Sequence, residues 1–203
     1  MNGDTTADLQ NLIERLRSGD ESARGALLER VHHRLRRIAA ATLQKDFRRL
    51  SARHDVDSVV DEAWAQLMKA LETNRPVTVD EFYRLIFRKV RHVLLDMARR
   101  QSRDDARRQD ETPVEERSDS ESPFDPGDTT YEPSRLAFWT EFHKEVESLP
   151  DEQRVVFDFH YFAEFPQAEI ARLLDLHPKQ VSRLWIAATV RLAQRLDGLD
   201  GLI

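Results

Sequence analysis

The chain has 203 residues and no cysteine, and its 31 Lys and Arg against 37 Asp and Glu give a formal net charge of −6. Without cysteine, a disulfide framework and a cysteine-ligated metal site are excluded. No run of about 18 apolar residues is present, which argues against a transmembrane helix, and the first residues lack the basic and apolar regions of a secretory signal. We therefore expect a cytoplasmic protein. With only 6 Gly and few β-branched runs, an all-β fold and a glycine-rich nucleotide-binding fold are both disfavoured.

The charge is divided unevenly along the chain. Residues 1–108 contain 22 basic and 17 acidic residues. Residues 109–134 contain 1 basic and 9 acidic residues, and residues 135–203 contain 8 basic and 11 acidic residues. The middle segment contains four prolines and few large apolar side chains, so it cannot bury enough surface to offset its chain entropy. We expect two domains, 1–108 and 135–203, joined by a disordered acidic linker at 109–134. A long surface loop within one domain is the less favoured alternative, because such loops are uncommon in compact domains.

Apolar residues in the first part of the chain recur with helical spacing. The pattern i, i+3, i+4, i+7 predicts a first helix around residues 9–16, which Ser18-Gly19-Asp20 ends. Further helices are predicted at 22–43, at 55–72 and from 80 to beyond 100.

The second part of the chain is also predicted to be helical. Ser134 is expected to cap a helix that carries apolar residues at helical spacing, and Pro150-Asp151 starts another. Two more helices are predicted at 167–174 and 178–196, with only three residues between them. A short helix, a brief turn and a longer helix form a candidate helix-turn-helix. The predicted fold class is therefore all-α, with two small helical domains.

The last predicted helix, residues 178–196, carries much of the positive charge of the second part of the chain. Residues 177–196 contain four basic residues and no acid, whereas residues 135–176 contain four basic and nine acidic residues. A basic helix of this kind can enter a major groove, where it meets phosphates and base edges. One side is predicted to pack on the preceding helix through Val181, Trp185, Ala188 and Leu192. The outward residues near its start are candidate DNA contacts: Lys179, Gln180, Ser182 and Arg183. An ordinary helical hairpin with a solvated basic face is the alternative.

Two further charged clusters lie in the first part. Residues 88–108 hold eight basic residues against three acids, next to Phe82, Tyr83 and Phe87. Basic residues beside aromatic rings suit nucleic acid with unpaired bases, although these aromatics are better explained as core. An acidic cluster, Asp55, Asp57, Asp61 and Glu62, begins the helix at 55–72. It either complements the helix dipole or forms a docking face for a basic partner.

Taken together, the two parts resemble regions two and four of the small bacterial sigma factors of the extracytoplasmic-function (ECF) type. The family's docking helix reads D-A-E-D-L-V-Q-E-x-F, and residues 55–64 here read DVDSVVDEAW. In the family's next helix, F-x-x-W-L-x-x-I-A-x-N-x-x-x-D-x-x-R-R-x-x-R, the matching residues are Phe82, Ile86, Val90, Asp96, Arg99, Arg100 and Arg103. The final domain matches at Leu149-Pro150, Arg154, Glu169-Ile170-Ala171, Leu174 and Val181. This chain departs from the family pattern at Leu85, Lys89, His92, Asp175, His177 and Gln180.

The resemblance implies a sigma factor that binds core RNA polymerase and directs promoter recognition and transcription initiation. It implies that Asp57, Asp61 and Glu62 bind the polymerase. It places Lys89, His92, Arg99, Arg100 and Arg103 at the minus-ten element, and Lys179, Gln180, Ser182 and Arg183 at the minus-thirty-five element. An anti-sigma factor is a further candidate partner. The alternative function is a helix-turn-helix regulator that binds DNA without joining polymerase.

The sequence does not favour an enzyme. It has no H-E-x-x-H, no glycine-rich phosphate loop and no G-x-S-x-G. Its single Glu29-x-x-His32 falls short of the two such motifs that a di-iron helix bundle needs. No cofactor and no metal are therefore expected.

Overall fold

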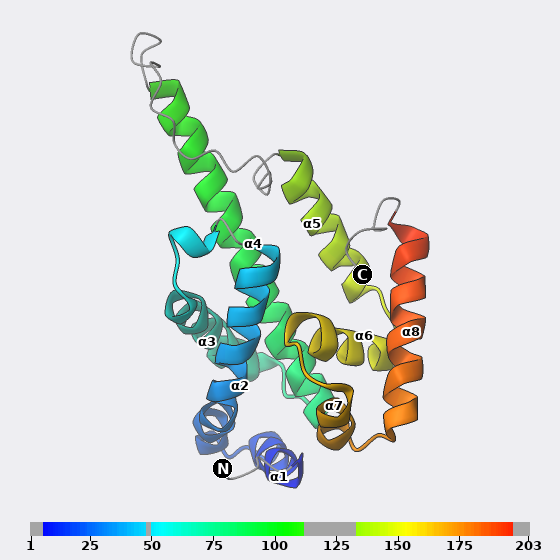
Figure 1. Cartoon of the computed structure of the whole chain (residues 1–203). Coiled ribbons are helices and arrows are strands. Elements are labelled where there is room, and N and C mark those ends of the chain that lie inside the picture. The colour runs from blue at the N-terminus through cyan, green and yellow to red at the C-terminus, as the bar shows by residue number, and fades with distance from the viewer. Residues whose placement is uncertain (1–5, 48–49, 112–132, 197–203) are drawn as a thin grey trace.

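The computed structural model describes residues 6–47, 50–111 and 133–196, and these residues form helices without strands (Figure 1). The first half contains α1 (Thr6–Arg17), α2 (Ser22–Asp46), a 3-10 turn η1 (Leu50–Ala52), α3 (Val56–Thr73) and α4 (Val79–Glu111). The second half contains α5 (Pro133–Glu147), α6 (Asp151–Phe157), a π-helical turn η3 (Asp158–Phe162), α7 (Gln167–Leu174) and α8 (Pro178–Arg195). The predicted all-α fold class is confirmed.

Local side-chain chemistry sets the helix starts in the first half. Asp55 precedes α3 in an extended conformation, and its carboxylate accepts a hydrogen bond from the backbone N–H of Ser58 at 2.8 Å. Such a cap satisfies a donor that the helix leaves unpaired. The helix α4 continues to Glu111, three residues into the segment expected to be linker. The rest of that segment, residues 112–132, lies outside the described residues.

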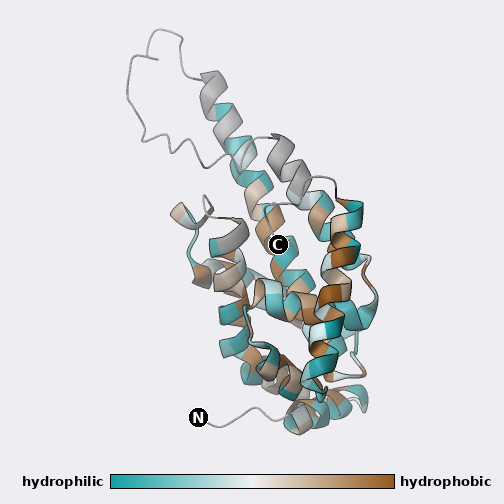
Figure 2. Cartoon of the chain, turned by 45° about the vertical axis from the view of Figure 1, so that its right-hand side comes forward, coloured by the Kyte–Doolittle hydropathy of each residue, from teal (hydrophilic) through white to brown (hydrophobic). Residues whose placement is uncertain are grey.

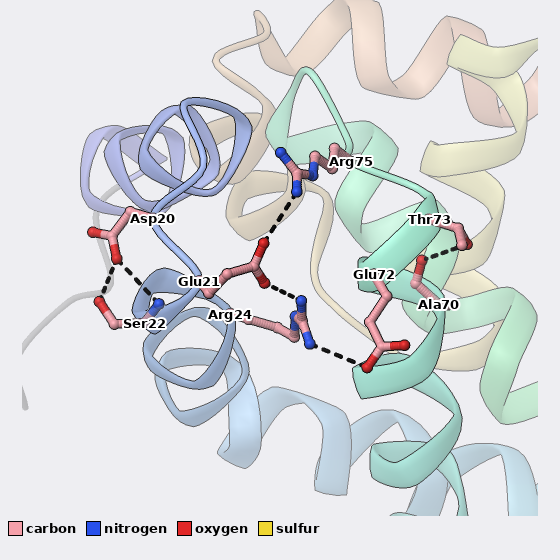
Figure 3. A network of polar contacts seen from close by, with 8 residues as sticks. All are labelled: Asp20, Glu21, Ser22, Arg24, Ala70, Glu72, Thr73 and Arg75. Carbon is pink, nitrogen blue, oxygen red and sulfur yellow. Dashed lines mark hydrogen bonds and ion pairs between the residues drawn. The ribbon is translucent and has the colours of Figure 1, made fainter.

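A polar network fixes the N-terminus of α2 against the C-terminus of α3 (Figure 3). Arg24 pairs with Glu72 at 3.2 Å, while Glu21 accepts from Arg24 and, at 3.1 Å, from Arg75. Arg75 belongs to the connection between α3 and α4. The network therefore joins α2, α3 and the start of the segment that leads into α4.

The start of α5 and the end of α6 both differ from what the sequence predicted. The helix α5 begins at Pro133, so Ser134 lies inside the first turn and does not precede it as a cap. Proline suits a first helical position because its fixed φ is already helical. After α6 the chain widens into the π-helical turn η3, which the apolar spacing did not predict.

The helix-turn-helix forms between α7 and α8. Asp175 ends α7 in the left-handed region, at φ 54°, which Asp adopts more readily than most residues. His177 caps α8, because its Nδ1 accepts from the backbone N–H of Lys179 at 3.2 Å. Val181, Ala188 and Leu192 are fully buried as predicted. The predicted burial of Trp185 is only partial; its ring stacks on Phe157 at 5.4 Å between centroids.

The two halves pack against each other through one hydrophobic cluster. Both α5 and α6 contact α4 (Figure 1). Phe82, Tyr83 and Phe87 of α4 are buried, which confirms that they belong to the core. Phe159 of η3 lies 4.8 Å from Tyr83 and 5.0 Å from Phe87, measured between ring centroids. Figure 2 shows hydrophobic and hydrophilic residues interleaved along the helices, as expected of amphipathic segments.

Candidate functional site

The acidic cluster at the start of α3 divides into residues with different surroundings. Asp55 is the helix cap, and hydrogen bonds from the Ser58 hydroxyl and N–H lower the pKa of its carboxyl. Asp57 forms an ion pair with Arg36 of α2. Asp61 is exposed and forms no ion pair with any residue that the structure describes. Of the three candidate docking residues, Asp61 is therefore the most available to a partner.

The Asp61 side chain lines a small groove between α2 and α3. The groove has a volume of about 330 Å³ and is lined by Asp61, Val60 and Trp64 of α3 and by Glu29 and His32 of α2. The His32 and Trp64 rings meet edge to face at 5.6 Å. From the sequence, Glu29 and His32 were considered only as a metal motif, and Trp64 was aligned with the last residue of the family's docking motif without being assigned a contact. The available signal was spacing, because Trp64 lies three residues after Asp61 and shares its face of α3.

Glu62 does not face the same way as Asp61. Its carboxylate accepts two hydrogen bonds from Arg100 of α4, at 2.9 and 3.1 Å. The structure thus joins one residue predicted to bind polymerase with one predicted to bind DNA. Both side chains are partly exposed, so this surface pair contributes little to stability.

The candidate minus-ten residues are spread around α4. Arg100 faces α3 through Glu62, whereas His92 and Arg99 line a groove of about 290 Å³ that faces α5. His92 Nε2 lies 3.4 Å from a carboxylate oxygen of Glu147, and burial lowers the pKa of this imidazole. Lys89 is half-buried and Arg103 is exposed. The second half therefore lies beside part of the predicted DNA surface.

The candidate minus-thirty-five residues lie together at the start of α8. Lys179, Gln180 and Arg183 are exposed and Ser182 is half-buried. They occupy the first turns of the helix, where Lys179 and Arg183 lie opposite the buried residues and Gln180 and Ser182 lie on the flanks. The predicted outward orientation is confirmed for Lys179, Gln180 and Arg183, whereas Ser182 is only partly exposed. The role of the group in reading DNA stays a prediction.

A buried ion pair between the halves was not predicted. Arg91 of α4 donates to Asp158 of η3 at 2.6 Å, and the side chains are 2% and 1% exposed. Burial raises the pKa of Asp158 to about 6, although the nearby positive charge of Arg91 opposes this shift. The signal available was the position of Arg91, four residues after the buried Phe87 on the apolar side of α4. A charge in such a stripe indicates a buried partner.

The part of the chain that the structure describes contains no group of three His, Asp or Glu able to hold a metal ion. The same residues include no helix long and apolar enough to cross a membrane.

Comparison with known proteins identifies the family. A family model described as "ECF sigma factor" matches residues 6–198. Among curated proteins, none matches the chain. The family match covers both helical halves and the segment between them, and the candidate contact residues on α3, α4 and α8 all fall within it. This chain belongs to the ECF sigma factor family.

Proposed function

We propose that the chain joins core RNA polymerase through the groove between α2 and α3, and that α4 and α8 then recognise the two elements of a promoter. Family membership supports a role in transcription initiation. In this proposal the chain acts in the cytoplasm, polymerase performs the catalysis, and the chain itself needs no cofactor.

The groove around Asp61 is the observation that carries the proposal. An exposed carboxylate beside a partly buried Trp64 offers both a charge and an apolar surface. Tryptophan is enriched at the energetic centres of protein interfaces. A regulator that acts on DNA alone has no need for this second surface, which favours a factor that docks on a larger enzyme.

The DNA contacts follow from position and charge. The minus-ten element is contacted by residues of α4, namely Lys89, His92, Arg99, Arg100 and Arg103. Lys179, Gln180, Ser182 and Arg183 read the minus-thirty-five element. Arg183 is the best candidate for a bidentate contact with guanine, and Gln180 for one with adenine.

Transcription in vitro tests the proposal directly. Core polymerase is supplied with the purified chain and a library of genomic fragments, and the transcripts are sequenced. We expect starts at a set of sites with shared upstream elements. A matched reaction without the chain controls for initiation by polymerase alone. Equal transcripts in both reactions would contradict the proposed function.

A further inference from the structure

We propose that a cavity between α4, α5 and α6 binds a small anion that carries two or more phosphate groups, through arginines that line the cavity from several sides. The cavity has a volume of about 600 Å³, which lies within the range of small-molecule sites in proteins. Its lining comes from the connection between α3 and α4, from α4, and from α5 and α6. The lining contains none of the residues assigned above to polymerase or to the promoter, so this inference goes beyond the proposed function.

Five arginines line this cavity. Three of them, Arg84, Arg88 and Arg91, follow the spacing i, i+4, i+7 on α4, so they share one side of the helix along about 10 Å of its length. The other two are Arg75, from the connection between α3 and α4, and Arg154 of α6. The same lining contains three carboxylates, those of Glu81, Glu147 and Asp151. Positive charge is therefore in excess, and it is spread over a length that suits a chain of phosphates better than a single carboxylate.

Three of these guanidinium groups have a donor without an acceptor. Among the described residues, the Nε atoms of Arg84, Arg91 and Arg154 are buried and have no hydrogen-bond partner. The Arg91 side chain as a whole is 2% exposed. Buried donors are normally paired, because an unpaired one keeps the cost of its lost hydration. Phosphate oxygens are acceptors that match the guanidinium fork, so a phosphate seated against these side chains would supply the missing acceptors.

The carboxylates of the lining hold the arginines in position. Asp151 pairs with Arg84 at 2.6 Å and with Arg154 at 2.7 Å. Arg154 also donates to the backbone carbonyl of Glu147 at 2.6 Å. Side chains that are already ordered lose less conformational entropy when a ligand binds. Arg88 differs from them, because it is exposed and forms no ion pair with any residue that the structure describes. Its charge is therefore free to attract an anion.

The size of the cavity favours a small ligand over DNA. A double helix contacts proteins over a broad surface, whereas a recess of about 600 Å³ admits a molecule of nucleotide size. The site is therefore assigned to a small oligophosphate and not to a nucleic-acid backbone. An inorganic oligophosphate and the phosphate chain of a nucleotide share this chemistry, and the experiment distinguishes them.

The experiment titrates the full chain with inorganic tripolyphosphate in a calorimeter. Physiological ionic strength is used, because salt screens the attraction between exposed charges. The test variant is Arg88→Gln, which removes a charge from the cavity without breaking an ion pair that the structure describes. The matched control is Arg17→Gln, at an exposed arginine of α1 outside the cavity. A third variant, Glu147→Gln, removes a carboxylate from the lining and leaves a side chain of nearly the same size.

We expect the wild type to bind one tripolyphosphate per chain. Arg88→Gln should bind about tenfold more weakly, the usual effect of losing one charge-assisted contact, while Arg17→Gln should match the wild type. Glu147→Gln should bind more tightly, a gain that damage to the fold would not produce. Absence of saturable binding by the wild type, or equal affinities of the Arg88→Gln and Arg17→Gln variants, would overturn the site.

Two further titrations identify the occupant. Adenosine triphosphate replaces tripolyphosphate in the first: tighter binding would identify a nucleotide, and equal or weaker binding an inorganic phosphate chain. The second uses a random-sequence DNA duplex. If Arg88→Gln weakened duplex binding as much as tripolyphosphate binding, the arginines would belong to a DNA surface and the small-ligand site would be overturned. None of these titrations contains polymerase or a promoter, so their outcome is independent of the proposed function.

Discussion

His143 and Asp158 are two buried titratable residues near the contact between the halves, and their pKa values shift in opposite directions. Burial lowers the pKa of His143 well below 6.5, and burial raises that of Asp158 from 3.8 to about 6. Because His143 is neutral when folded, its contribution to stability is present above pH 6.5 and is lost as the pH falls below that value. Asp158 binds its proton more tightly when folded, so its contribution grows as the pH falls from about 6 toward 4.

The substitution His143→Phe should separate these two effects. It removes two unpaired nitrogens from an aromatic site formed with Phe47, Trp139 and Phe162. We expect a gain of about 1 kcal/mol or more at neutral pH, the typical cost of an unsatisfied buried group. The variant should also lose less stability than the wild type between about pH 7 and pH 5. Urea unfolding at both pH values measures this, and an unchanged difference between them would contradict the role of His143.

Asp61 is the residue on which the docking proposal can be tested most cleanly. Asp61→Lys should weaken binding to core polymerase about tenfold or more, because it sets like charges against each other at a basic partner surface. The far-UV circular dichroism should stay unchanged, since Asp61 is exposed. Glu14→Lys on α1 is the control, because Glu14 is exposed and lies outside the groove. Equal binding by the two folded variants, measured by titration with labelled chain, would argue against the docking groove.

At the scale of elements, α8 carries packing and the proposed base readout on opposite sides. Arg183→Ala should relax base preference at one or two positions, by roughly 1–3 kcal/mol of discrimination. Arg191→Ala removes the same charge from an exposed position two turns further along α8 and should leave that preference intact. The measurement is selection of randomised minus-thirty-five elements by holoenzyme that contains each variant. The same selected sequence for Arg183→Ala and the wild type would place the readout elsewhere.

The helices were predictable because each carries an apolar stripe with a recognisable start or stop. Asp55 caps α3, Ser18-Gly19-Asp20 separates α1 from α2, and Pro178 begins α8. The π-helical turn η3 was not predictable. Its Phe159 and Phe162 fit a continuous α-helical pattern just as well, and only packing against α2, α4 and α7 distinguishes a π-helical from an α-helical turn. The burial of Trp185 was overestimated for a related reason. Helical periodicity shows which side of the helix a side chain points to, but it does not show how much of that side chain the neighbouring helices cover.

At the scale of the whole molecule, sequence reasoning identified two helical halves but did not predict their contact. Arg91 and Asp158 are 67 residues apart in sequence, and each lies in a helical pattern that is complete without the other. The charge composition alone showed that residues 1–108 are basic and that residues 135–176, in the second half, are acidic. It did not show that three acids would face Arg84, Arg91 and His92, because that depends on which faces of α4, α5 and α6 meet.

The buried pair predicts how the whole molecule responds to the loss of one charge. Asp158→Asn leaves Arg91, whose side chain is 2% exposed, with only the more distant carboxylate of Glu147 at 3.9 Å. Removing one partner of a buried pair typically costs about 3–5 kcal/mol. Separation of the halves gives Arg91 access to water, so the cost is limited to the free energy of opening. We therefore expect retained helix content by circular dichroism. We also expect reduced energy transfer between a fluorescent donor and acceptor attached at Lys69→Cys on α3 and Gln194→Cys on α8, which are exposed positions in a chain without native cysteine. His160→Asn, at a half-buried residue of the same turn, is the control. Loss of helix together with loss of transfer would show that the halves cannot fold apart, and retained transfer would show that Arg91 finds another partner while the halves stay packed together.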